Sequence, residues 1–148
     1  MKYNYKKLDY NTEDLESLSN SDLKKVADYW LRQYLLSVHK NGIYYFCPLK
    51  NKNYGLSNMH VAHYYDRGIM NTRYDLINCH LISSVSNTFD AQVKVEGYKS
   101  LHHKDYQEFL IEKYGQEGFD KLTERSKQMK IFYKEDYIEI INKFRSNE

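Results

Sequence analysis

The sequence has few of the residues that would cross-link a chain or carry it across a membrane. Among its 148 residues are only two cysteines, Cys47 and Cys79, too few for a disulfide framework or a four-cysteine zinc site. We expect both to be reduced thiols that pack as small apolar side chains. No apolar run approaches the roughly eighteen residues of a membrane span, and residues 1–7 lack the apolar stretch of a signal peptide. These absences predict a cytoplasmic protein without membrane contact.

A strong excess of one charge is also missing. The formal net charge is +2, which does not by itself indicate a nucleic-acid binder. The middle of the chain is more basic: residues 40–73 carry five basic side chains, Lys40, Lys50, Lys52, Arg67 and Arg73, against the single acid Asp66. Such a segment suits a phosphate backbone, but an ordinary solvated surface explains it equally well.

The spacing of apolar residues predicts an α+β chain forming a single domain over 1–148. Residues 1–20 are polar, and a leading helix is expected over 21–41 with Ser21 as its N-cap. Short strands are expected at 43–46 and 59–65, a turn at 51–55, and a short helix at about 83–90, all within a core unit spanning 43–93. A helical tail is expected over 101–148, with a stop at Gly115 and a last helix from Lys134.

Five side chains between positions 60 and 87 could carry chemistry: His60, His63, Asn78, His80 and Asn87. A histidine on a strand, an asparagine in a loop and a ligand on a helix are the parts of a ββα-metal nuclease site. In such a site the histidine takes a proton from water, the asparagine orients it, and a hard cation stabilises charge on the phosphate. Each residue also has a structural explanation, because strand histidines are often core residues and an asparagine before a helix is often a cap.

A resemblance sharpens this hypothesis. The segments MHVAHYYDRG at 59–68, NTRYD at 71–75 and NCHL at 78–81 resemble the NinG (Rap) recombination proteins of lambda-type phages. The similarity extends to the leading helix at 27–34 and to the tail at 106–122. It implies an HNH-type ββα-metal core flanked by N-terminal and C-terminal helices.

The chain departs from that family where the family has two Cys-x-x-Cys pairs suited to structural zinc. The corresponding positions here read CPLK at 47–50 and SSVS at 83–86, so three of four thiolates are missing. Serine and lysine are poor zinc ligands. We therefore expect a degenerate knuckle with no structural zinc.

By the same resemblance, His63 would be the general base and Asn78 the residue that orients it. One Mg²⁺ or Mn²⁺ ion would be held by Asn87 together with His80 or His60, and Arg67 and Arg73 would contact DNA phosphates. The position just before the base is Ala62, so a ligand usual in such sites is missing there.

The implied activity is that of a divalent-metal-dependent endodeoxyribonuclease acting on branched DNA such as Holliday junctions. Resolving a junction takes two cuts, which makes a homodimer plausible by symmetry. Two other functions are compatible with the sequence. One is a catalytically inactive phage accessory that binds DNA or protein on the same fold, and the other is a small structural domain without a nucleic-acid partner.

Overall fold

The N-terminal third is organised by one long amphipathic helix. The computed structural model describes residues 7–146, so the first six residues of the expected polar segment lie outside the described residues. After a short 3₁₀ turn, η1 (Leu15–Ser17), helix α1 spans Asn20–His39. Its N-cap is Ser19 and not the expected Ser21, because the Ser19 hydroxyl accepts a hydrogen bond from the Asp22 amide at 3.1 Å.

A three-stranded antiparallel sheet follows directly, with strand order β1-β2-β3. It consists of β1 (Lys40–Asn41), β2 (Tyr44–Cys47) and β3 (Lys52–Tyr54). Gly42, with φ +65°, makes the tight turn between the first two strands, since L-residues rarely adopt that conformation. The turn expected over 51–55 is wrong for most of its length, because Lys52–Tyr54 pairs with β2 and only Asn51 has a positive φ.

The second sheet contains the segment singled out by the sequence. After a 3₁₀ turn, η2 (Leu56–Asn58), strand β4 (Met59–His63) pairs antiparallel with β5 (Cys79–Ser83), placing Ala62 opposite His80 and His63 opposite Cys79. Between them a loop carries the single helical turn α2 (Met70–Arg73). The expected helix at 83–90 is a π-helical turn, η3 (Val85–Phe89), followed by a 3₁₀ turn, η4 (Asp90–Gln92). Apart from the single turn α2, the order along the chain is therefore β4, β5 and the helical turn η3.

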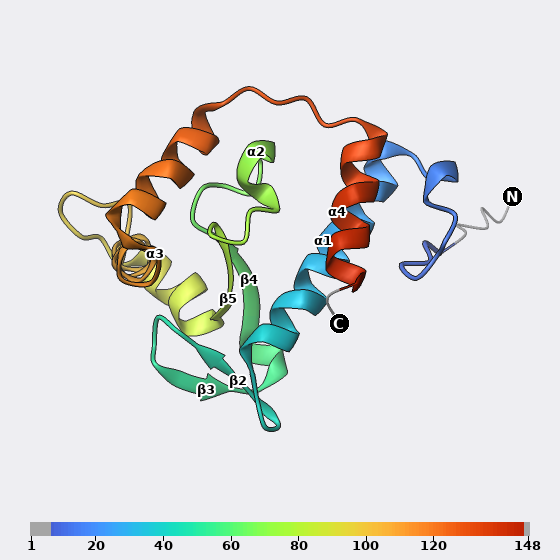
Figure 1. Ribbon diagram of the computed structural model, residues 1–148. Coiled ribbons are helices and arrows are strands. Elements are labelled where there is room, and N and C mark those ends of the chain that lie inside the picture. The colour runs from blue at the N-terminus through green and yellow to red at the C-terminus, as the bar shows by residue number, and fades with distance from the viewer. Residues whose placement is uncertain (1–6, 147–148) are drawn as a thin grey trace, which may run out of the picture.

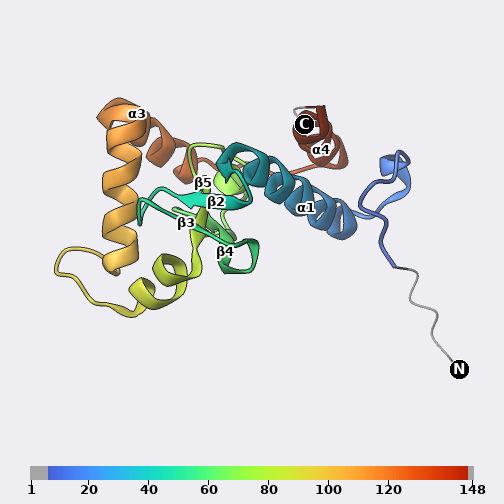
Figure 2. The same cartoon turned by 90° about the horizontal axis from the view of Figure 1, so that it is seen from below.

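Two helices complete the molecule. Helix α3 (Leu101–Lys127) is broken at Gly115, whose φ of +76° is not helical, so the expected stop is a sharp kink. Helix α4 (Lys134–Ser146) begins at the expected residue and packs along α1. Figure 1 shows this pair on one side of the β4–β5 ribbon and α3 on the other. Figure 2 shows α3 standing well apart from α4, joined to it by the connector at 128–133.

One apolar cluster joins these elements. It includes Leu23 and Leu31 of α1, Leu81 of β5, Leu110 of α3 and Ile141 of α4, all at most 1% exposed. Cys47 and Cys79 are buried, unpaired members of it, as expected. The fold is α+β, with small antiparallel sheets and flanking helices. Within residues 7–146 no helix is long and apolar enough to span a membrane.

Candidate active site

A cavity of about 250 Å³ lies between α1 and the strand β4. We call it the histidine cavity, and seven residues line it: Asp28, Leu31, Arg32, His60, Val61, His63 and Arg67. Strand β4 pairs only with β5 in its sheet, so its other edge is unpaired. Although side chains three apart on a strand alternate in direction, His60 and His63 both border this cavity. The structure therefore brings these two histidines together.

His63, the last residue of β4, is held in a defined protonation state. Its Nε2 lies 2.9 Å from the Arg73 carbonyl oxygen, so Nε2 must carry the proton of this hydrogen bond. Nδ1 then has a free lone pair, and no residue from 7 to 146 makes a hydrogen bond to it. Burial lowers the pKa of His63 below its ordinary 6.5, and the positive charge of Arg73 lowers it further. The ring is therefore neutral and basic at neutral pH.

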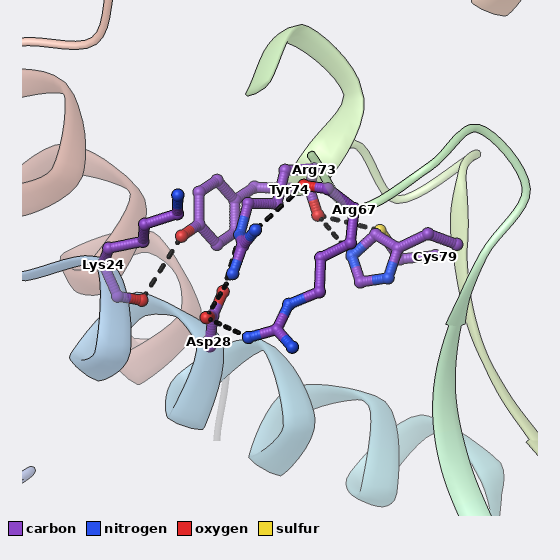
Figure 3. Close-up of polar contacts among 7 residues, drawn as sticks. Lys24, Asp28, Arg67, Arg73, Tyr74 and Cys79 are labelled. Atoms are coloured by element: carbon purple, nitrogen blue, oxygen red, sulfur yellow. Dashed lines mark hydrogen bonds and ion pairs between the residues drawn. The ribbon is translucent and has the colours of Figure 1, made fainter. Parts of the chain in front are cut away.

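Arg73, whose carbonyl accepts the hydrogen bond from His63, is itself held in place through its guanidinium group. The Arg73 guanidinium binds Asp28 with both Nε and Nη2, at 3.0 and 2.6 Å, and its Nη1 donates to the Arg67 carbonyl at 2.8 Å. Arg67 adds a third bond to Asp28 at 2.9 Å. Figure 3 shows Asp28 on α1 receiving both guanidinium groups, which come from the loop after β4. We call these three residues the Asp28 cluster.

The two arginines expected to contact DNA differ in their exposure. Arg73 is 5% exposed, and all three of its guanidinium nitrogens have partners within the protein. It is a structural residue and is not placed to meet a phosphate. The Arg67 side chain is 64% exposed and reaches Asp28 through Nη2. Arg67 therefore remains open to solvent at the rim of the histidine cavity.

Asn78 is fully buried and does not contact His63. Its Oδ1 accepts from the Tyr65 amide at 2.8 Å, and its Nδ2 donates to the carbonyls of Tyr65 and Thr72 at 3.1 and 3.0 Å. These bonds pin both ends of the loop between β4 and β5. Since Thr72 immediately precedes Arg73, Asn78 orients His63 only through the backbone turn that carries the Arg73 carbonyl. The direct contact expected from the sequence is absent among the described residues.

His80 lies in the core and not with the other site residues. It is 3% exposed, with Nδ1 2.9 Å from the Tyr106 hydroxyl and Nε2 2.9 Å from the Tyr114 hydroxyl. Burial lowers the pKa of His80 to about 3, and the charge of Lys113 adds to this effect. Both ring nitrogens are occupied, so this structure does not offer His80 as a metal ligand. It is instead a satisfied core histidine.

His60 and Asn87 are the expected ligands that do meet. The Asn87 Nδ2 lies 3.4 Å from His60 Nδ1, long for a hydrogen bond. Rotating the amide by 180° would place its oxygen there instead. Two neighbouring ligands of an octahedral cation lie about 3.0 Å apart, given bonds of about 2.1 Å. The 3.4 Å separation of the pair is slightly longer than that spacing. Within residues 7–146, no group of three or more His, Cys, Asp or Glu side chains is placed to share a metal.

Sequence reasoning missed Asp28 and Arg32, which line the histidine cavity from α1. They are four residues apart, the spacing of an ordinary exposed ion pair on a helix. Nothing in the sequence separates them from a solvated helix face. Only the packing of the loop after β4 against α1 gives them a role.

A larger cleft, of about 520 Å³, lies between α4, the end of α3 and the loop at 70–77. Its lining includes both acidic and basic side chains, among them Asp136, Glu139, Arg125 and Lys130, and no histidine. Without a histidine or an excess of one charge, this cleft is a weaker candidate site than the histidine cavity.

In comparisons with known proteins, no protein-family model, curated protein or solved structure matches the chain.

Proposed function

We propose that the protein is a divalent-metal-dependent endodeoxyribonuclease in which His63 is the general base. The observation that carries this proposal is the state of His63: its Nε2–H is fixed on the Arg73 carbonyl and its Nδ1 is free, at the wall of a cavity that also holds two arginines. A neutral imidazole fixed through one nitrogen is well suited to take a proton with the other. The order of β4, β5 and η3 is compatible with a ββα-metal core.

In the proposed reaction, His63 Nδ1 accepts a proton from water as the water oxygen attacks phosphorus. A phosphorus–oxygen bond of the backbone breaks, and the departing oxygen takes up a proton from solvent. The guanidinium at the cavity rim, Arg67, lies where it can neutralise phosphate charge. The Arg73 carbonyl keeps the His63 ring from rotating, and the Asp28 cluster keeps that carbonyl in place.

His60 and Asn87 would hold the cation, Mg²⁺ or Mn²⁺, and bound there it would supply positive charge to the phosphate. Neither ligand is a carboxylate, and Asp28, the one carboxylate of the cavity, already receives both arginines. Two neutral ligands make a weak site whose remaining positions water and phosphate oxygens would fill. We therefore propose that the cation binds mainly together with DNA.

Three parts of the proposal are supported by the sequence resemblance alone. They are the preference for branched recombination intermediates, the dimer that two cuts would use, and membership of the NinG (Rap) family. The histidine cavity supports the more general proposal that a histidine base hydrolyses a phosphodiester bond.

A second function is favoured by the charge arrangement of the cavity. Because the Asp28 carboxylate is bound by arginines and His80 lies in the core, the site has fewer metal ligands than the sequence predicted. A catalytically inactive accessory that binds DNA or protein on this fold would have these features. It differs from the nuclease in one observable respect, the absence of cutting with any divalent cation.

The distinguishing experiment is a cleavage assay on a synthetic four-way junction and on a linear duplex of matched sequence. Each is incubated with the protein in Mg²⁺, in Mn²⁺ and in excess chelator. The nuclease proposal predicts cutting that requires a divalent cation. Binding of either DNA without any cutting in Mg²⁺ or Mn²⁺ would favour the accessory.

A further inference from the structure

Arg32, in the second half of α1, has no counter-ion among the described residues. It borders the histidine cavity together with His60 and His63 and is only half-buried. Its one hydrogen bond runs from Nη1 to the Met59 carbonyl and is long, at 3.4 Å. Among residues 7–146 no carboxylate lies within ion-pair distance of it. Most of its guanidinium donors are therefore unused by the protein.

The Asp28 cluster explains why Arg32 has no ion-pair partner on its own helix. Asp28 lies four residues before Arg32 on the same helix, the spacing at which an acid and a base usually pair. Here the Asp28 oxygens face the loop after β4, where Arg73 binds both and Arg67 binds one. The arginines of the loop therefore occupy Asp28, the carboxylate with which Arg32 would otherwise pair. A half-buried guanidinium whose donors the protein leaves unused is available to hydrogen-bond an anionic ligand.

The net charge of the histidine cavity is positive, which also favours an anionic ligand. Its lining holds Arg32 and Arg67 against Asp28, a formal sum of two minus one, or +1. Arg73 binds Asp28 from behind and brings the local sum to +2. His63 adds nothing, since burial lowers its pKa and keeps it neutral. The cavity is thus a positively charged recess whose one acid, Asp28, is already neutralised by arginines.

We infer that Arg32 binds a phosphate group of the DNA backbone inside the histidine cavity. The inference rests on the proposed function for the identity of the ligand. A guanidinium presents a planar fork that holds two phosphate oxygens at once, which a lysine cannot do. Arg32 reaches the cavity from α1 and Arg67 from the opposite loop, so a phosphate between them is bound from both sides next to the His63 ring. Arg32 is a substrate-binding residue.

The test measures DNA binding and not cleavage. All variants carry His63→Ala, and chelator is present, so that no strand is cut. A fluorescein-labelled linear duplex is titrated at salt concentrations from 50 to 200 mM. Arg32→Gln removes the charge while keeping a good helix former. Lys25→Gln is the matched control, since Lys25 is exposed on the same helix and lies outside the cavity lining. Arg32→Lys keeps the charge but loses the fork.

Arg32→Gln should weaken binding at 50 mM salt by about tenfold and lower the salt slope by about one ion. The deficit should shrink about threefold between 50 and 200 mM salt, because one counter-ion fewer is released. Arg32→Lys should fall between the parent and Arg32→Gln, and Lys25→Gln should have little effect. Equal effects of Arg32→Gln and Lys25→Gln on affinity and slope would overturn the inference.

Thermal melting of each variant shows whether it folds. If Arg32→Gln melts below the assay temperature, Arg32→Lys carries the test alone, and parental affinity for that variant would overturn the inference. The outcome is independent of catalysis. A parent that binds DNA through Arg32 but never cuts it contradicts the proposed nuclease and leaves this inference standing.

Discussion

The carbonyl oxygen of Arg73 accepts a hydrogen bond from His63 Nε2 at 2.9 Å, and this one contact fixes which ring nitrogen can act as a base. Arg73 is in turn fixed by Asp28 on a different element, helix α1. The state of His63 therefore depends on a charge cluster whose one acid, Asp28, comes from a different and distant part of the sequence.

The pH dependence of cleavage should follow the lowered pKa of His63. The free base is the active form, and burial lets it persist below the ordinary histidine value of 6.5. The midpoint of the decline in cleavage with falling pH, where Nδ1 takes up a proton, should therefore lie below 6.5. Single-turnover rates between pH 4.5 and 8.5 test this. A midpoint at or above pH 6.5 would contradict it.

Breaking the Asp28 cluster should destabilise the protein. Asp28→Asn leaves the Arg73 guanidinium buried with one acceptor fewer and no counter-ion, so we expect a loss of about 2–3 kcal/mol in the free energy of unfolding. Arg67→Gln removes only the exposed member and should cost less than about 1 kcal/mol. Urea unfolding of both variants measures the difference. Equal losses would mean that Arg73 is not the residue Asp28 stabilises.

Acid should destabilise the fold partly through His80. The folded protein keeps His80 neutral until about pH 3, whereas the unfolded chain protonates it near 6.5. Between these values the unfolded state binds more protons, so stability falls as the pH falls, in total by on the order of a few kcal/mol. His80→Gln removes this titration and should flatten the dependence of unfolding free energy on pH over that window. An unchanged slope would show that His80 does not titrate as described.

Cation binding should be weak in the absence of DNA. His60 and Asn87 supply two ligands at most, and water must fill the remaining positions. Calorimetric titration with Mn²⁺ should show at best millimolar affinity, weakened further by His60→Ala, and tighter binding once uncut DNA is present with His63→Ala. His103→Ala, in α3, should not alter it. Micromolar binding to the free protein that survives His60→Ala would place the cation elsewhere.

The sequence was informative where local spacing determines structure. The start of α4 at Lys134, the break at Gly115 and most of the strand expected at 59–65 follow from periodicity and glycine chemistry, whereas the pairing of that strand with β5 was not predicted. It was uninformative where a side chain's role depends on what packs against it. Arg73 and Arg67 look alike in the sequence, yet one is buried against Asp28 and the other is exposed.

The same limit applies to the histidines and to Asn78. His60 and His80 are both strand histidines, but only His80 has two tyrosine hydroxyls from α3 beside it. Those tyrosines lie 26 and 34 residues further along the chain, so no local pattern could assign His80 to the core. The sequence suggested that Asn78 contacts His63, but in the structure Asn78 instead hydrogen-bonds the backbone of the loop between β4 and β5. Asn78→Ala would therefore lower the stability of the fold as well as the rate of DNA cleavage.

The most direct test of the account is the cleavage rate of His63→Ala on a four-way junction with Mg²⁺ or Mn²⁺, measured beside the parent and beside His103→Ala, a histidine on α3 outside the cavity. A general base contributes on the order of a hundred- to ten-thousand-fold in rate. His63→Ala should therefore lose at least about a hundredfold while keeping its affinity for the junction, and His103→Ala should cut like the parent. Cutting by His63→Ala at the parental rate would contradict the role of His63, and a parent that cuts no DNA with either cation would contradict the enzyme itself.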